Sequence, residues 1–169
     1  MNIPQPSENL QKLIEKIKKK KSEACTHQFN LLDELHANEN THTRILVRLL
    51  QIPSLLHSFL VYLNESFSEL ALDIPGNLSP SDVTEFSDYI DAKIETEKFC
   101  IIIENKINNA VDQHRQIERY VTSVQPTNKK VVVLYLTLDG TKEPDGNSIG
   151  ESKAQIIKIN YKKTYSVLA

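Results

Sequence analysis

The sequence lacks any apolar run of about 18 residues, the length that a membrane-spanning helix needs. Near its start it has Pro4 and Pro6 and no apolar stretch of the kind found in signal peptides. Its two cysteines, Cys25 and Cys100, match no disulfide framework, which favours reduced thiols that serve in packing. These absences predict a soluble, cytoplasmic protein without a membrane partner.

Motifs of several enzyme classes are also missing. There is no glycine-rich phosphate loop, no G-x-S-x-G nucleophile elbow and no zinc motif. The five histidines show no metal-ligand spacing. We interpret all of them as surface or capping residues: His27, His36, His42, His57 and His114.

Charge of one sign does not dominate. The chain has 20 basic and 22 acidic residues and a net charge of −2, so any binding of a polyanion would depend on a local patch. The densest basic patch consists of Lys16, Lys18, Lys19, Lys20 and Lys21. It fits the solvated face of an N-terminal helix as well as a nucleic-acid contact.

Apolar residues at helical spacing predict that the first half of the chain is helical. The expected helices cover the first 36 residues, a segment capped by Asn40 or Thr41 that ends before Pro53, and residues 54–72. After Pro80 the pattern changes to strands. We expect strands at 83–95, 99–107, 131–138 and 154–161, with a helix at 110–124.

The order of these elements favours a mixed sheet. A short connection at residues 96–98 joins the first two strands as a hairpin, and the helix at 110–124 joins two continuously apolar strands as a crossover. The prediction is an α/β fold of the mixed α+β type, in one domain over residues 1–169. Residues 1–37 would form a helical extension and residues 38–161 the core.

Glu104 and Lys106 stand at the end of the most apolar strand. Because side chains alternate along a strand, both point to one face. A buried carboxylate and a buried ammonium are costly unless they pair or bind something. One interpretation is a structural ion pair at the end of a strand.

Asp91 favours a different interpretation. It lies on the neighbouring hairpin strand, roughly opposite Ile102 or Ile103, so its carboxylate can approach Glu104. Two close carboxylates repel each other, and a divalent cation relieves the repulsion. Ligands that are all oxygens favour Mg²⁺ or Mn²⁺. Asp88 is an alternative ligand, since a bulge would reverse which of the two aspartates faces Glu104.

Asp91 followed by Glu104-x-Lys106 at the end of an apolar strand resembles the PD-(D/E)XK nuclease superfamily. Gln116 and Tyr120 match the Q-x₃-Y pattern of its RecB-like members, and the region after Glu39 is similar to one bacterial branch. The resemblance implies a restriction-endonuclease-like fold, with a central mixed sheet between helices. Relatives tend to continue beyond the position of Ala169, so a C-terminal segment is expected to be missing.

The resemblance also implies roles for individual residues. Asp91 and Glu104 would bind Mg²⁺ or Mn²⁺ with help from Glu39, and Lys106 would orient or activate water. Gln116 and Tyr120 would support the substrate phosphate or the metal shell.

The hypothesis is therefore a metal-dependent nuclease that hydrolyses DNA, ahead of RNA, in bacterial defence or DNA processing, and that forms a homodimer. The alternatives are a catalytically inactive module of the same fold that binds nucleic acid or a protein, and a structural domain with an ordinary ion pair.

Overall fold

The computed structural model describes residues 38–87, 90–107, 111–124, 128–161 and 164 of the chain. The helix expected over the first 36 residues, with its lysine patch, lies outside the described residues, and so does Asp88. The description below concerns the unit that spans residues 37–169.

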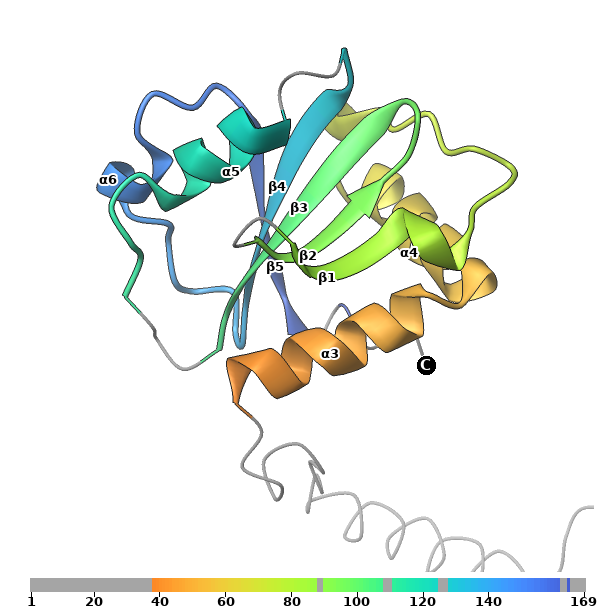
Figure 1. Cartoon of the computed structure of the whole chain (residues 1–169), viewed down its shortest axis with the longest axis horizontal. Coiled ribbons are helices and arrows are strands. Elements are labelled where there is room, and N and C mark those ends of the chain that lie inside the picture. Colours follow the sequence, from red (N-terminus) through yellow and green to blue (C-terminus); the bar gives the residue numbers. More distant parts are fainter. Residues whose placement is uncertain (1–37, 88–89, 108–110, 125–127, 162–163, 165–169) are drawn as a thin grey trace, which may run out of the picture. The chain divides into compact units, whose positions relative to one another are not determined.

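A five-stranded mixed sheet forms the centre of this unit (Figure 1). Its strands lie in sequence order: β1 (Val83–Ser87), β2 (Ile90–Glu95), β3 (Phe99–Lys106), β4 (Lys130–Thr137) and β5 (Gln155–Asn160). The pairs β1–β2 and β2–β3 are antiparallel, whereas β3–β4 and β4–β5 are parallel. The prediction of a mixed α+β sheet is confirmed.

The first predicted strand, residues 83–95, is wrong as a single element. It consists of β1 and β2, which pair antiparallel with Ser87 opposite Ile90. Alternation of apolar and polar residues stops at the break, where the polar Ser87 and Asp88 precede the apolar Tyr89 and Ile90. Because of the break the sheet has an additional antiparallel strand at its edge.

α3 (Glu39–Leu50) and α4 (Pro53–Ser66) precede the sheet. The N-cap of α3 is Asn38, whose side chain accepts a hydrogen bond from the backbone N–H of Thr41, so the expected cap at Asn40 or Thr41 is wrong. α4 begins at Pro53, where a proline costs no hydrogen bond. It is shorter than the predicted 54–72.

Neither helix is long and apolar enough to cross a membrane alone, and the same holds for every other helix within the described ranges. Taken together, α3 and α4 have the length and the composition of a membrane-spanning segment, but the pair is bent by 103° at the break between the two helices.

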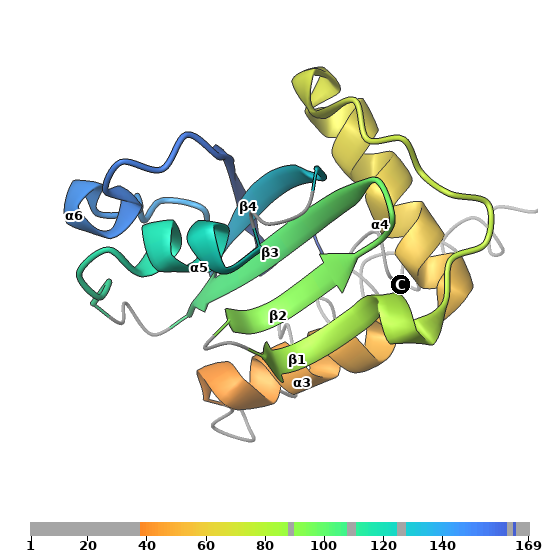
Figure 2. The same cartoon turned by 45° about the horizontal axis from the view of Figure 1, so that its top comes forward.

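The helices cover the two faces of the sheet (Figures 1 and 2). α3 and α4 pack on one face, against a core that includes Ile101, Ile103 and Val132. α5 (Gln116–Val124) packs on the other face, against Ile102, Val133 and neighbours. Every residue of β3 is buried, as expected for a strand covered on both faces.

α5 begins later than the predicted position 110. Arg115, the residue before it, has a left-handed backbone (φ 52°), which interrupts a right-handed helix. A short helix, α6 (Gly146–Ile149), lies between β4 and β5, where the sequence predicted neither a helix nor a strand. The backbone N–H of Arg115 donates to the carbonyl of Asn147, which ties the start of α5 to α6.

Candidate active site

Strand register brings the polar residues of three strands to one end of the α5 face. Ala92 pairs with Ile103, so the next step of the same register places Asp91 opposite Glu104. On the other side of β3, Glu104 pairs with Tyr135 of β4. Directly paired residues point to the same face of a sheet. The prediction placed Asp91 one or two residues away, opposite Ile102 or Ile103, so the observed register brings the two acids closer.

Glu104 is a buried carboxylate with only one of its oxygens engaged. Its side chain is 2% exposed, and Oε1 lies 2.8 Å from Nζ of Lys106. Oε2 is buried and has no hydrogen-bond partner within the described ranges. Burial, together with the negative charge of Asp91, raises the pKa of Glu104 from its usual 4.5 to about 7. The side chain therefore has an unused acceptor atom, and its ionised form is unfavourable in this environment.

Asp91 is held in place by the backbone of β3. Its Oδ2 accepts a hydrogen bond of 2.8 Å from the backbone N–H of Asn105. Burial raises the pKa of Asp91 above its usual value, although the Asn105 hydrogen bond and the charge of Lys106 act in the opposite direction. The charge of Glu39 raises it further.

Lys106 places its ammonium among three acceptors. Nζ lies 2.8 Å from Oε1 of Glu104, 3.2 Å from Oε1 of Gln116 and 3.4 Å from Oδ1 of Asp112. An ammonium has three N–H groups, so all three have a partner in this arrangement. Burial lowers the pKa of Lys106, but attraction to Glu104 and Asp112 outweighs burial and leaves the pKa above its usual value. Lys106 is therefore a fixed positive charge.

Gln116 and Tyr120 extend this network from α5. Oε1 of Gln116 accepts from Lys106 and from the backbone N–H of Gln113, and its Nε2 donates to the Tyr120 hydroxyl at 2.7 Å. Burial and the charge of Glu104 raise the pKa of Tyr120 well above its usual value, so the phenol stays neutral. The two residues of the Q-x₃-Y pattern thus contact each other and, through Gln116, Lys106.

Asp112 is a member of this network that the sequence interpretation missed. Its side chain is only 2% exposed, and it accepts hydrogen bonds from the Tyr135 hydroxyl (2.9 Å) and the backbone N–H of Asp145 (2.7 Å). One signal was available in the sequence. A tyrosine in a continuously apolar strand needs a partner for its hydroxyl, and Asp112 is that partner for Tyr135.

Glu39 lies at the first turn of α3, beside the same end of the sheet. Its backbone carbonyl accepts a hydrogen bond of 3.1 Å from Nδ2 of Asn105, which also donates to Oγ1 of Thr43. Asn105 therefore anchors α3 against β3. The Glu39 carboxylate is near enough to influence the pKa of Asp91. Within the described part of the chain, however, no three His, Cys, Asp or Glu side chains form a group that could hold a metal ion.

The histidines divide into two kinds. His57 and His114 are exposed, as predicted, and His27 and His36 lie outside the described residues. His42 is buried, so its interpretation as a surface or capping residue is wrong. It stands edge-on to the ring of Tyr161, with centroids 5.2 Å apart, in the core beneath α3.

The chemistry of the site fits a hard divalent cation. Asp91 and Glu104 supply carboxylate oxygens, which suit Mg²⁺ or Mn²⁺. Oε2 of Glu104 is a buried acceptor without a partner among the described residues, and a cation would satisfy it. The negative charge of Asp91 adds to the electrostatic cost of ionising Glu104. A cation between the two carboxylates would offset this cost.

Comparison with known proteins agrees with this geometry. The chain matches the family model described as the PD-(D/E)XK nuclease superfamily over residues 84–169, which is 86 of its 169 residues. The match includes Asp91, Glu104 and Lys106. Searches of curated proteins and of solved structures found no significant match. The mixed sheet is compatible with a restriction-endonuclease-like core, and the chain belongs to the PD-(D/E)XK nuclease superfamily.

Proposed function

We propose that this protein is a metal-dependent nuclease that hydrolyses phosphodiester bonds of DNA, with Mg²⁺ or Mn²⁺ as its cofactor. Membership of the superfamily supports nuclease chemistry in general. The observation that carries the proposal is the buried Oε2 of Glu104, which has no hydrogen-bond partner among the described residues, in a side chain that faces the charge of Asp91. Isolated buried acceptors are costly, so a site that keeps one has a use for it.

Asp91 and Glu104 are the proposed ligands, and Glu39 is a proposed third ligand from α3. A divalent cation bound there would polarise a phosphoryl oxygen and lower the pKa of a bound water. The protein's own part is to hold two carboxylates in fixed positions. Asp91 is fixed by the Asn105 N–H, and Glu104 is fixed by Lys106. Fixed ligands avoid the cost of reorganisation during the reaction.

Lys106 is proposed to orient the attacking water or the phosphate once a cation has weakened its ion pair with Glu104. Its other two contacts, with Gln116 and Asp112, would keep the ammonium at the site after that change. Gln116 and Tyr120 are proposed to support the phosphate or the metal shell. Their direct hydrogen bond supports a joint role, as the RecB-like Q-x₃-Y variant implies.

The wider assignments are proposals of the same kind. DNA is preferred to RNA, the role is bacterial defence or DNA processing, and the protein acts in the cytoplasm as a homodimer. One domain with a helical extension over residues 1–37 is the proposed organisation.

A second candidate function is a catalytically inactive module that keeps the fold and binds nucleic acid or a protein. The ion pair between Lys106 and Glu104 favours this alternative, because it satisfies one carboxylate oxygen without a metal. The two candidates differ in what a cation does to the protein.

Titration with Mn²⁺ and Mg²⁺, followed by thermal unfolding and by cleavage of plasmid and single-stranded DNA, separates them. Wild type should gain thermal stability with Mn²⁺ because only the folded state has the site, and it should cleave. Glu104→Gln should lose both effects, while the exposed Glu143→Gln should keep both. Stabilisation and cleavage that survive in Glu104→Gln would refute the proposed site.

A further inference from the structure

A cavity of about 410 Å³ lies beside the proposed metal ligands. It is lined by Asp91, Gln113, Gln116, Arg119 and Tyr120. Three of these residues belong to the proposed site, and Gln113 and Arg119 are additional. The cavity therefore connects the Asp91 carboxylate with polar donors of α5.

The Tyr120 hydroxyl is oriented as a donor toward this cavity. Gln116 has two donors at Oε1, so its Nε2 faces Tyr120 and occupies the acceptor side of the hydroxyl. No acceptor for the Tyr120 proton is found among the described residues. Because Tyr120 lines the cavity, its O–H is available to an anion there.

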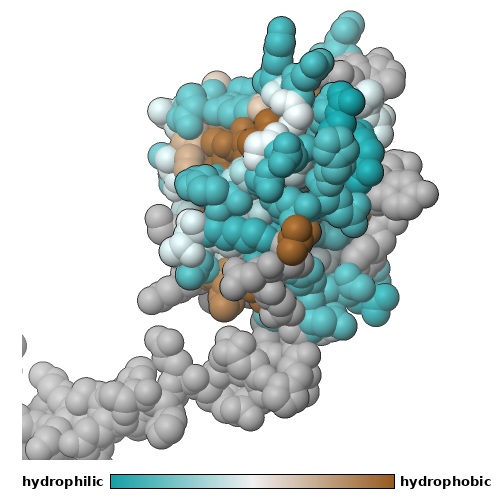
Figure 3. Space-filling model, turned by 90° about the vertical axis from the view of Figure 1, so that its left-hand side faces the viewer, coloured by the Kyte–Doolittle hydropathy of each residue, from teal (hydrophilic) through white to brown (hydrophobic). Residues whose placement is uncertain are grey.

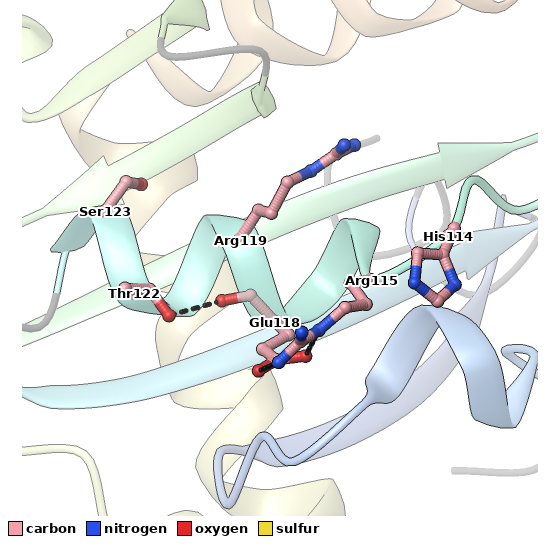
Figure 4. A pocket seen from close by; sticks show the side chains of 6 residues that line it. All are labelled: His114, Arg115, Glu118, Arg119, Thr122 and Ser123. Carbon is pink, nitrogen blue, oxygen red and sulfur yellow. Dashed lines mark hydrogen bonds and ion pairs between the residues drawn. The ribbon is translucent and has the colours of Figure 1, made fainter.

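Arg119 is available in the same way. Its guanidinium donates to the neutral amide of Gln113 at 3.0 Å and has no carboxylate partner in the described part of the chain. By contrast, the neighbouring Arg115 is paired with Glu118. Figure 4 shows Arg119 extending away from the Arg115–Glu118 pair. The side of the molecule on which α5 and α6 lie in Figure 1 is mostly hydrophilic in the space-filling view (Figure 3).

We propose that the cavity is a phosphate-binding subsite, in which Arg119 and Tyr120 bind a phosphate of a nucleic-acid backbone next to the scissile one. A guanidinium offers several N–H groups in a plane, a geometry that matches phosphate oxygens. The Asp91 carboxylate lies on the same cavity, so a divalent cation should strengthen phosphate binding. This inference rests on the proposed nuclease function for the identity of the ligand.

The test is binding of a short, fluorescently labelled DNA strand, measured by anisotropy in EDTA and in Ca²⁺. The variants are Arg119→Gln, Arg119→Lys and Tyr120→Phe. Arg48→Gln is the matched control, because Arg48 on α3 is exposed and its loss changes the net charge equally. A methylphosphonate strand, which carries no backbone charge, is the second probe. Thermal unfolding of each variant verifies that it is folded.

Arg119→Gln should weaken binding about ten-fold or more, as expected for a lost charge-assisted hydrogen bond. It should also reduce the log–log salt slope by roughly 0.7 for a single strand. Tyr120→Phe should weaken binding about three-fold, and Arg119→Lys should bind more tightly than Arg119→Gln. The methylphosphonate strand should not distinguish wild type from Arg119→Gln.

Two results would overturn the subsite. One is unchanged affinity in Arg119→Gln. The other is an equal loss in Arg48→Gln, which would mean a general effect of charge. Failure of the nuclease proposal is visible separately, since it appears as absence of metal-dependent cleavage by wild type. Loss of DNA binding in Arg119→Gln would support the subsite even then.

Discussion

Asp91 on β2 accepts a hydrogen bond from the backbone N–H of Asn105 on β3, with 2.8 Å between the two atoms. This bond fixes the carboxylate opposite Glu104 and leaves its other oxygen for a ligand. The arrangement makes the contribution of Asp91 to cation binding separable from its contribution to the fold.

Asp91→Asn should therefore abolish Mn²⁺ binding and cleavage while the protein stays folded. An asparagine oxygen can still accept the Asn105 hydrogen bond, but it brings no charge to the cation. Calorimetric titration with Mn²⁺ measures the first effect and a plasmid assay the second. Asp88→Asn, assayed in parallel, is the matched variant. If Asp88→Asn were inactive and Asp91→Asn active, the ligand would be Asp88, and the assignment of Asp91 would be wrong.

The pKa of Glu104 predicts how the metal-free protein responds to pH. The folded-state pKa, about 7, lies above the usual 4.5. Between these two pH values the folded state keeps a proton on Glu104 that the unfolded state releases. The associated stability is complete below about pH 4.5 and is lost as pH rises through about 7. The size is on the order of 3 kcal/mol, because one pH unit corresponds to about 1.4 kcal/mol.

Urea unfolding of wild type and Glu104→Gln in EDTA, between pH 5 and 8, measures this effect. The free energy of unfolding of wild type should fall as pH rises across this range. That of Glu104→Gln, which has no carboxyl group to ionise there, should fall less. Mn²⁺ should restore stability to wild type at pH 8, where Glu104 is ionised. Parallel pH profiles for the two proteins would contradict the assignment of a raised pKa to Glu104.

The pair of acids and the lysine were predictable because they depend on local rules. A continuously apolar strand predicts burial on both faces, and alternation places Glu104 and Lys106 together. The short connection before Phe99 brings β2 alongside β3 and so brings Asp91 to Glu104. Each step uses only residues within one hairpin.

Other parts of the site depend on contacts between distant segments. Asp112 is buried because Tyr135 and the backbone of Asp145 bind it from β4 and from the segment before α6. Asn105 points to α3, more than 60 residues earlier in the chain, as its hydrogen bond to Thr43 shows. No periodicity in the sequence carries this information, since the partners of both residues lie in segments far away along the chain.

Asn105→Ala should lower the free energy of unfolding by about 1 to 3 kcal/mol. The Asn105 amide donates to the Glu39 carbonyl and to Thr43, and without it these acceptors lose a partner. Since the amide also anchors the first turn of α3, the variant should bind Mn²⁺ less well if Glu39 is a ligand. Asn64→Ala is the control, because Asn64 makes two comparable bonds to the backbone of Leu72. If the two variants lost equal stability but only Asn105→Ala bound Mn²⁺ less tightly, the role of Glu39 would be supported. Unchanged Mn²⁺ affinity in Asn105→Ala would oppose it.

Lys106→Ala should lower turnover more than affinity for DNA. The ammonium lies next to Glu104, where the attacking water is proposed to stand, so its loss belongs to the chemical step. Single-turnover cleavage gives the rate, and anisotropy in Ca²⁺ gives the affinity. A change confined to affinity would make Lys106 a phosphate ligand instead.

Asp112→Asn should weaken Mn²⁺ binding although Asp112 is not a proposed ligand. Its carboxylate lies 3.4 Å from Nζ of Lys106 and shares that ammonium with Glu104. Without the charge of Asp112, Lys106 would pair more strongly with Glu104 and compete with the cation, and the site would also be more positive by one charge. Both effects act in the same direction, and together they correspond to a loss of affinity on the order of ten-fold.

Tyr135→Phe is the variant that separates charge from structure in this prediction. It removes the hydroxyl that donates to Asp112 at 2.9 Å but leaves every charge in place. It should lower the free energy of unfolding by about 1 kcal/mol and leave Mn²⁺ affinity nearly unchanged. If Tyr135→Phe and Asp112→Asn weakened Mn²⁺ binding equally, Asp112 would act by supporting the fold of its segment. If only Asp112→Asn did so, Asp112 would set the position and strength of the Lys106 charge beside the two acids.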